Sequence, residues 1–134
     1  MSSVWERGVE LPKFETVKSD KKVDVLIIGG GMAGLLCGYF LQGRGAKYAI
    51  IEKNRIAGGV TKNTTAKITS QHGLIYSGLC QDFGQEKAAA YLKANELALA
   101  QYQKMAAEID CDFEEKDAYV YSLNDREKIE KEIT

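Results

Sequence analysis

The sequence lacks the features that mark several large classes of protein. Its longest apolar run, around Val25 to Ile28, is far short of the roughly 20 residues that a membrane-spanning helix needs. The N-terminal segment has no apolar core of the kind found in secretory signals. The formal net charge is only −1, which gives no reason to expect a nucleic-acid or membrane-surface partner. We therefore expect a cytoplasmic protein with no nucleic-acid and no membrane partner.

Cysteine and histidine are too few and too scattered for a disulfide framework or a metal site. The three cysteines, Cys37, Cys80 and Cys111, are odd in number and contain no C-x-x-C pair. We expect them to be reduced and mostly buried. His72 is the single histidine, so the chain has neither a metal-ligand spacing nor a Ser-His-Asp triad. No catalytic residue and no metal ligand can be assigned from the sequence.

The sequence does contain a strand–turn–helix–strand unit at residues 23–52. Val23 to Ile28 is a short apolar run rich in β-branched residues, typical of a strand buried on both faces of a parallel sheet. Residues 32–42 carry apolar side chains at helical spacing, and the glycines that follow are expected to end that helix. Residues 48–51 predict a second buried strand. This order is that of a βαβ unit.

A glycine-rich turn joins the first strand to the helix. Gly29, Gly31 and Gly34 form a G-x-G-x-x-G pattern, and Glu52 stands at the end of the second strand. This is the full dinucleotide-binding fingerprint: the glycines allow a tight turn, approach of the pyrophosphate and close helix–strand packing. The helix N-terminus offers N–H groups to phosphates. A carboxylate at residue 52 can bind ribose hydroxyls and would repel the extra phosphate of NADP.

Beyond Glu52 the pattern changes along the chain. A long, Gly- and Thr-rich stretch has no period, and loops of that length are often functional. A helical segment, 74–109, follows; its long helix has one apolar stripe, whose tyrosines we expect in the core. Asn124 or Asp125 is expected to cap a last charged helix. In order, we expect a loop, a short helix, a long helix, a short β-hairpin and a final helix: 53–73, 74–83, 85–109, 111–122 and 124–134.

These elements predict an α/β fold: a partial Rossmann-like βαβ unit, then a helical segment and a short β-hairpin, in an incomplete doubly wound domain. Residues 1–22, with Trp5 and Phe14, read as an extended lead-in, and residues 23–134 as the N-terminal part of a dinucleotide-binding domain. A complete domain needs about four or five parallel strands, and two are present. A helical pattern continues to Thr134, so we expect a truncated piece of a longer enzyme. Its open sheet edge makes homo-oligomers plausible.

The chain also resembles a known family. The GGGMAGL turn, the Glu52-Lys53 pair, the loop from Gly58 to Thr61 and the run NTTAKITSQHGLIY at residues 63–76 look like the FAD-dependent D-amino-acid oxidase and glycine oxidase superfamily. The lead-in and the tail DFEEKDAYVYS at 112–122 resemble the branch whose full-length members carry a C-terminal Rieske [2Fe–2S] domain. The resemblance covers nearly the whole chain, and the run after Gly58 is its most specific part. It implies that residues 23–134 are the N-terminal part of an FAD-binding domain.

The resemblance implies roles for individual residues. The glycine turn would hold the FAD pyrophosphate, Glu52 the adenosine ribose, and Lys53 would flank the adenine. The following loop would wrap the phosphates and ribityl chain and approach the flavin. Some members attach flavin through a histidine about where Lys67 stands, so noncovalent FAD is expected here. The implied cofactor-binding residues are Gly29, Gly31, Met32, Ala33, Gly34, Glu52, Lys53, Gly59, Val60, Thr61, Thr64, Thr65 and Lys67.

The resemblance also implies an activity for the longer parent enzyme. A small amine or amino acid would be oxidised by hydride transfer to flavin N5, with electrons passing to oxygen or to a Rieske [2Fe–2S] cluster found only in the full-length parent. His72 could lie near the flavin or cap the short helix that follows it. Two alternatives remain open: an NAD-binding, non-catalytic redox-sensing module, and an inactive fragment. We expect this piece to bind FAD weakly or to have lost it, because missing strands would supply part of the pocket.

Overall fold

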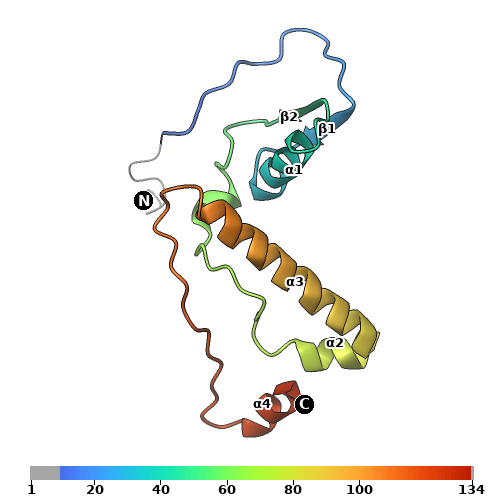
Figure 1. Ribbon diagram of the computed structural model, residues 1–134, viewed down its shortest axis with the longest axis vertical. Coiled ribbons are helices and arrows are strands. Elements are labelled where there is room, and N and C mark those ends of the chain that lie inside the picture. Colours follow the sequence, from blue (N-terminus) through green and yellow to red (C-terminus); the bar gives the residue numbers. More distant parts are fainter. Residues whose placement is uncertain (1–9, 134) are drawn as a thin grey trace. The chain divides into compact units, whose positions relative to one another are not determined.

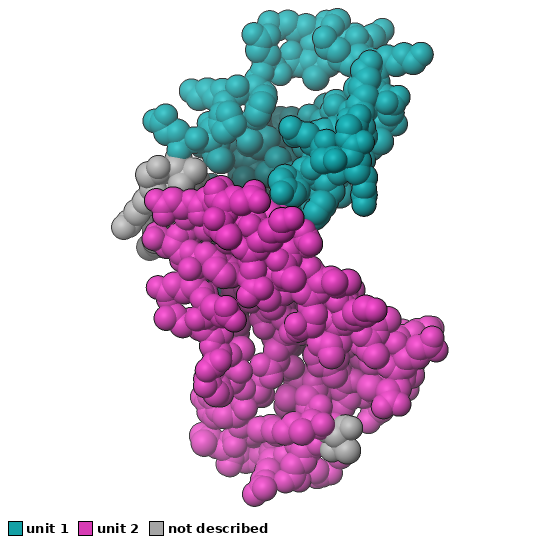
Figure 2. Space-filling model, in the orientation of Figure 1, with its two compact units in different colours: residues 1–66 teal, residues 67–134 magenta. Residues whose placement is uncertain are grey.

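The computed structural model describes residues 10–133 and divides into two compact units. Unit 1 ends at Ala66 and unit 2 begins at Lys67, and Figure 2 colours them teal and magenta. Trp5, part of the expected lead-in, lies outside the described residues. The lead-in from residue 10 to 22 contains no helix and no strand, as the sequence predicts.

Unit 1 is a βαβ unit (Figure 1). Strand β1 (Val25–Ile28) leads to helix α1 (Met32–Gln42) and then to strand β2 (Tyr48–Ile51). The strands pair in parallel, with Val25 opposite Tyr48 and Ile28 opposite Ile51. The expected partial Rossmann-like α/β fold is confirmed, and the bounds of α1 and β2 are those that the sequence predicts. A short 3₁₀ helix, η2 (Val60–Asn63), follows within the loop. Helix η2 could not be predicted from the sequence, because a single 3₁₀ turn has no detectable period.

Two glycines let α1 lie against β2 and then turn away. Gly38 is buried in the middle of α1, where an added Cβ would come 2.7 Å from Cδ1 of Ile50 and 3.0 Å from Cε2 of Tyr48. The helix therefore approaches the strand more closely than any side chain at this position would allow. After the helix, Gly45 has φ of +68° and its N–H donates to the carbonyl of Gln42. This left-handed turn redirects the chain into β2.

Unit 2 contains three helices: α2 (Tyr76–Phe83), α3 (Gln85–Ala106) and α4 (Arg126–Ile133). Gly84 alone joins α2 to α3, with φ of +85°, a conformation that favours glycine. Its N–H closes α2 on the carbonyl of Cys80, and its own carbonyl accepts the N–H of Ala88 at the start of α3. The two helices form a packed hairpin, visible in Figure 1. Ala88, 4% exposed, is the buried apolar residue of the described chain.

The predicted β-hairpin at 111–122 does not form. Between residues 10 and 133 the only sheet is the β1–β2 pair, and residues 113–121 belong to no strand. An isolated two-stranded hairpin is only marginally stable in water. Its predicted turn, residues 114–117, also lacks the Asn-Gly or Asp-Gly pair that favours tight hairpins. Tyr119 and Tyr121 are consequently 81% exposed.

The expected burial of several apolar residues is also wrong. Leu26 and Ile28 of β1 are 53% and 81% exposed, because α1 packs on the β1–β2 pair and no other described element covers the strands. A strand of a parallel sheet is buried on both faces only when neighbours exist on both faces. Tyr91 of α3, expected in the core, is 42% exposed. The three cysteines, expected to be mostly buried, are exposed.

Candidate functional site

The turn between β1 and α1 has a backbone that excludes side chains. Gly29 has φ of +110°, and its N–H donates to the carbonyl of Ile51 at 2.8 Å. A Cβ added to Gly34 would lie 2.0 Å from the carbonyl oxygen of Gly29. Residue 34 must therefore be glycine for α1 to begin directly over the turn. The fingerprint predicts both requirements from spacing alone.

Glu52, at the end of β2, is held by the same turn. Its Oε2 accepts the N–H of Gly30 at 2.8 Å, and its Oε1 accepts the N–H of Asn54 at 2.9 Å. Hydrogen bonds from the backbone of Asn54 and Gly30 lower the pKa of this carboxyl below its usual value, against a smaller desolvation effect that raises it. The side chain is exposed, so it is ionised and open to a ligand while it braces the glycine turn.

Gly30 is a site residue that the spacing argument missed. It is buried, and an added Cβ would come 3.0 Å from Cγ2 of Ile56 and 3.1 Å from Cβ of Glu52. Its carbonyl accepts the N–H of Ala57 at 2.7 Å, and Ala57 has φ of +52°. The loop after Glu52 therefore folds back onto the turn. The signal for Gly30 was its place as the middle one of three consecutive glycines, at a position that the fingerprint pattern treats as variable.

Thr61 brings a hydroxyl to the N-terminus of α1. Helix η2 positions it so that its Oγ1 accepts the N–H of Met32 at 3.1 Å. Gly31, the residue before the helix, makes no side-chain cap, and an added Cβ there would lie 3.4 Å from the same Oγ1. The first N–H groups of an α-helix have no acceptor within the helix, and Ala33 and Gly34 follow Met32 in that first turn. The residues present therefore fit a phosphate-bearing dinucleotide: glycines without Cβ atoms, helical N–H groups and a hydroxyl.

Other expected site residues are less well defined. Lys53, Gly59, Val60 and Thr65 are exposed. The backbone of Lys53 adds a weaker hydrogen bond to the Glu52 carboxylate, which also lowers the pKa of Glu52. Thr64 accepts the N–H of Ala66 through its Oγ1 at 3.3 Å, in a local turn. Lys67 is the first residue of unit 2. Their role as cofactor ligands stays a prediction.

His72 lies against α3. Its Nε2 is 3.2 Å from Oδ1 of Asn95, whose Nδ2 donates to the carbonyl of Tyr91 at 2.9 Å. Because that carbonyl can only accept, it fixes the Asn95 amide with its oxygen toward the imidazole. His72 therefore donates through Nε2, and its other nitrogen is the acceptor in the neutral ring. Of the two placements expected for His72, a cap on α2 is wrong.

No group of three or more His, Cys, Asp and Glu side chains among residues 10–133 is arranged to hold a metal ion. No helix within this range combines the length and the apolar character needed to cross a bilayer.

Comparison with known proteins places the whole βαβ unit and unit 2 in one family. The sequence model of the family described as FAD dependent oxidoreductase matches residues 24–134. The putative Rieske 2Fe-2S iron-sulfur protein YhfW of Bacillus subtilis is 39% identical over 123 residues, covering 90% of this chain and 24% of that protein. The chain thus spans about a quarter of the length of that relative.

Two further relatives match shorter stretches. The L-amino-acid oxidase of Echis ocellatus is 33% identical over 55 residues, which is 41% of this chain and 11% of that protein. The thiamine thiazole synthase of Pyrococcus furiosus is 38% identical over 56 residues, which is 42% of this chain and 22% of that protein. No solved structure matches the chain significantly.

Proposed function

The chain belongs to the FAD-dependent oxidoreductase family, and on that premise we propose that unit 1 binds the ADP half of FAD. The observation that carries this proposal is the brace around the glycine turn. Glu52 holds the N–H of Gly30, and Thr61 holds that of Met32, so both sides of the α1 N-terminus are already ordered. An ordered site loses less conformational entropy when a ligand binds.

Each part of the turn has a place in this binding mode. The N–H groups of Met32, Ala33 and Gly34 bind the pyrophosphate oxygens, and the missing side chain at Gly31 leaves room for them. The carboxylate of Glu52 accepts hydrogen bonds from the ribose hydroxyls, and Lys53 lies on the adenine side. Thr61 moves its hydroxyl from the helix N-terminus onto the phosphates. The remaining expected ligands, Gly59, Val60, Thr64, Thr65 and Lys67, extend the path toward the flavin.

For the longer enzyme we propose the oxidation of a small amine or amino acid. FAD, when bound, would supply the redox chemistry, which is the acceptance of a hydride at flavin N5 from the substrate carbon. The residues of this chain bind and orient the cofactor. The L-amino-acid oxidase among the relatives supports the substrate class. YhfW, whose name describes a Rieske protein and which matches 90% of this chain, supports a Rieske [2Fe–2S] cluster outside this chain as the electron acceptor.

Calorimetric titration of the chain with ADP, FAD, NAD and FMN tests the binding mode. We expect ADP and FAD to bind weakly, since the sheet of the described residues has two strands. NAD should bind no more tightly than ADP, and FMN should not bind, because unit 1 supplies the site for the half that FAD shares with ADP. NAD binding more tightly than both ADP and FAD would replace the proposal by an NAD-sensing module. No heat with any of the four would overturn binding by this chain and favour an inactive fragment.

Two glycines at opposite ends of α1 provide a matched pair of variants. Gly31→Ala places a methyl group where phosphate must approach, yet it meets only Oγ1 of Thr61 at 3.4 Å, so the fold is kept. Gly43→Ala adds the same group at the other end, 3.7 Å from its nearest neighbours. Loss of close phosphate contact should weaken ADP binding by about tenfold or more in Gly31→Ala, and Gly43→Ala should bind normally. Equal binding by both variants would place the ligand elsewhere.

A further inference from the structure

Helix α4 touches α2 through one carboxylate. Oε1 of Glu132 accepts the N–H of Tyr76 at 2.8 Å, and Oε2 accepts the N–H of Ser77 at 2.9 Å. These are the first two N–H groups of α2, which have no acceptor within their own helix. Ile75, the residue that precedes α2, provides no side-chain cap. Glu132, which is far from α2 in the sequence, therefore caps the N-terminus of α2 with both of its carboxylate oxygens.

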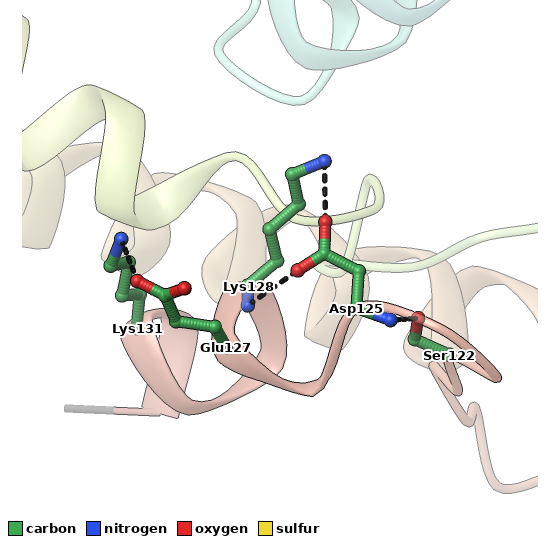
Figure 3. Close-up of polar contacts among 5 residues, drawn as sticks. All are labelled: Ser122, Asp125, Glu127, Lys128 and Lys131. Carbon is green, nitrogen blue, oxygen red and sulfur yellow. Dashed lines mark hydrogen bonds and ion pairs between the residues drawn. The ribbon is translucent and has the colours of Figure 1, made fainter.

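Several charged groups of α4 form ion pairs within α4 and its own N-terminal turn. Lys131 pairs with Glu127 at 2.7 Å, and Lys128 pairs with Asp125 at 2.7 Å; both ion pairs are drawn in Figure 3. Oδ1 of Asp125 also accepts the N–H of Lys128 at 3.3 Å, which confirms the expected helix cap. These i,i+3 and i,i+4 contacts stabilise α4 as a helix but do not attach it to anything else.

Apolar packing adds little to this attachment. Ile133 is 80% exposed and Ile129 is half-buried. The segment before α4, residues 113–121, forms neither helix nor strand. Burial of apolar surface is the usual means of holding helices together, and here little of it is buried. The two hydrogen bonds of Glu132 are therefore the main link between α4 and the rest of unit 2.

The α2–α3 hairpin is held by different contacts. The rings of Tyr76 and Tyr91 lie 6.2 Å apart, and the Tyr76 hydroxyl donates to the carbonyl of Ser70 at 2.6 Å. Ala88 is buried where the two helices meet. None of these contacts involves α4, so the hairpin does not depend on it.

We propose that Glu132 is a latch: α4 docks reversibly on the N-terminus of α2 through this carboxylate, and its loss releases α4 while the α2–α3 hairpin stays folded. An ionised carboxylate suits this role, because it is attracted by the positive end of the α2 dipole. Burial raises the pKa of Glu132, but the hydrogen bonds from Ser77 and Tyr76 outweigh it and hold that pKa below its usual value. The docked state keeps Tyr76 and Ser77 covered, and the released state exposes the α2 N-terminus.

Glu132→Lys and Glu127→Lys form a matched pair that tests the latch. The two variants have the same composition and net charge. Within α4 alone, a lysine near the C-terminus at residue 132 favours the helix, and a lysine in the first turn at residue 127 disfavours it. The latch predicts the opposite order for docking. Only Glu132→Lys removes the acceptors of Tyr76 and Ser77 and places a positive charge at the α2 N-terminus.

The readout is amide hydrogen exchange of the full chain followed by NMR. In Glu132→Lys, we expect exchange of the Tyr76 and Ser77 amides to rise by about tenfold or more, as loss of charged hydrogen bonds predicts, with the α3 amides unchanged. In Glu127→Lys, Tyr76 and Ser77 should keep their protection. The milder Glu132→Gln should give an intermediate result.

Two outcomes would overturn the latch. One is unchanged exchange at Tyr76 and Ser77 in Glu132→Lys. The other is a rise in exchange that extends equally through α3 in both Glu132→Lys and Glu132→Gln, since this would mean that α4 is an integral part of the fold of unit 2. Neither result bears on nucleotide binding by unit 1.

Discussion

The two units are organised by different kinds of contact. In unit 1 the decisive positions are glycines, and the contacts around them are made by backbone atoms: Gly29 with Ile51, and Gly30 with Ala57. In unit 2 the organising contacts are made by side chains of Tyr76, His72 and Glu132, which join segments far apart in sequence. At Gly34 and Gly38, unit 1 leaves no room for an added Cβ atom. Unit 2 relies instead on side-chain groups that a substitution can remove.

Alanine in place of a helical glycine should expose this contrast most strongly. Gly34→Ala in α1 puts a Cβ 2.0 Å from the carbonyl oxygen of Gly29, and the backbone itself must move. We expect unit 1 to lose about 3 kcal/mol or more, at the upper end of overpacking costs, and ADP binding to be lost. Gly78→Ala in α2 meets nothing within 4 Å. It should stabilise unit 2 by about 0.5–1 kcal/mol, the usual gain when alanine replaces a helical glycine.

Urea unfolding of the two variants, followed separately by NMR signals of each unit, measures both effects. If Gly34→Ala proved as stable as the unsubstituted chain, α1 would not lie as close to the glycine turn as the structure shows. Destabilisation by Gly78→Ala would show that the exposed side of α2 is covered by something that the described contacts do not include.

Removal of one hydroxyl should have a smaller effect, and only in unit 2. Tyr76→Phe keeps the ring next to Tyr91 but leaves the carbonyl of Ser70 without its 2.6 Å donor. The pKa of Tyr76 is raised, chiefly by desolvation, which indicates that water does not readily replace this partner. We expect the free energy of unfolding of unit 2 to fall by about 1 kcal/mol, typical of one hydrogen bond. Thermal unfolding of unit 2 measures this loss.

Tyr119→Phe is the control for Tyr76→Phe. The hydroxyl of Tyr119 also has a partner, Oδ2 of Asp117 at 3.0 Å, but its ring is 81% exposed. Water can replace that partner, so the change in stability should lie within about 0.5 kcal/mol of zero. Equal losses in the two variants would mean that the Ser70 contact is no more protected than a surface one.

The same contrast explains how much of the molecule the sequence predicted. The βαβ order, the bounds of α1 and β2, and the constraints at Gly29 and Gly34 followed from short-range patterns, because local spacing determines them. The capping of α2 by Glu132 and the placement of His72 on α3 did not, because they join residues that no periodicity relates. The predicted hairpin at residues 111–122 and the predicted burial of β1 were wrong for a shared reason. Both required neighbouring elements that the described residues do not supply.

Acid titration should show the smallest difference between the two units, because each unit contains a carboxylate that accepts two backbone N–H groups. In unit 1 it is Glu52, on Gly30 and Asn54. The pKa of Glu52 is lowered in the folded chain, chiefly by these hydrogen bonds. A lowered folded pKa stabilises the fold above the pKa of the unfolded chain, and this contribution is lost as pH falls through the folded value. Protection of the Gly30 amide should therefore be constant near neutral pH and should decline as the pH falls through the folded pKa of Glu52, which lies below the usual value for glutamate.

Glu52→Gln separates this titration from general acid unfolding. The amide side chain can still accept one N–H group but does not titrate. Protection of the Gly30 amide should therefore be lower at neutral pH and should lack the acid decline that protonation of Glu52 produces. Amide exchange of Gly30 and of Ser77, measured across the same pH range in parent and variant, gives both halves of the comparison. Of these two amides, the variant should alter the protection of Gly30 alone, because Ser77 is held by Glu132 in the other unit. If protection of the Gly30 amide did not change with pH in the unsubstituted chain, Glu52 would not brace the glycine turn. The ordered site proposed for ADP would then lose its main support.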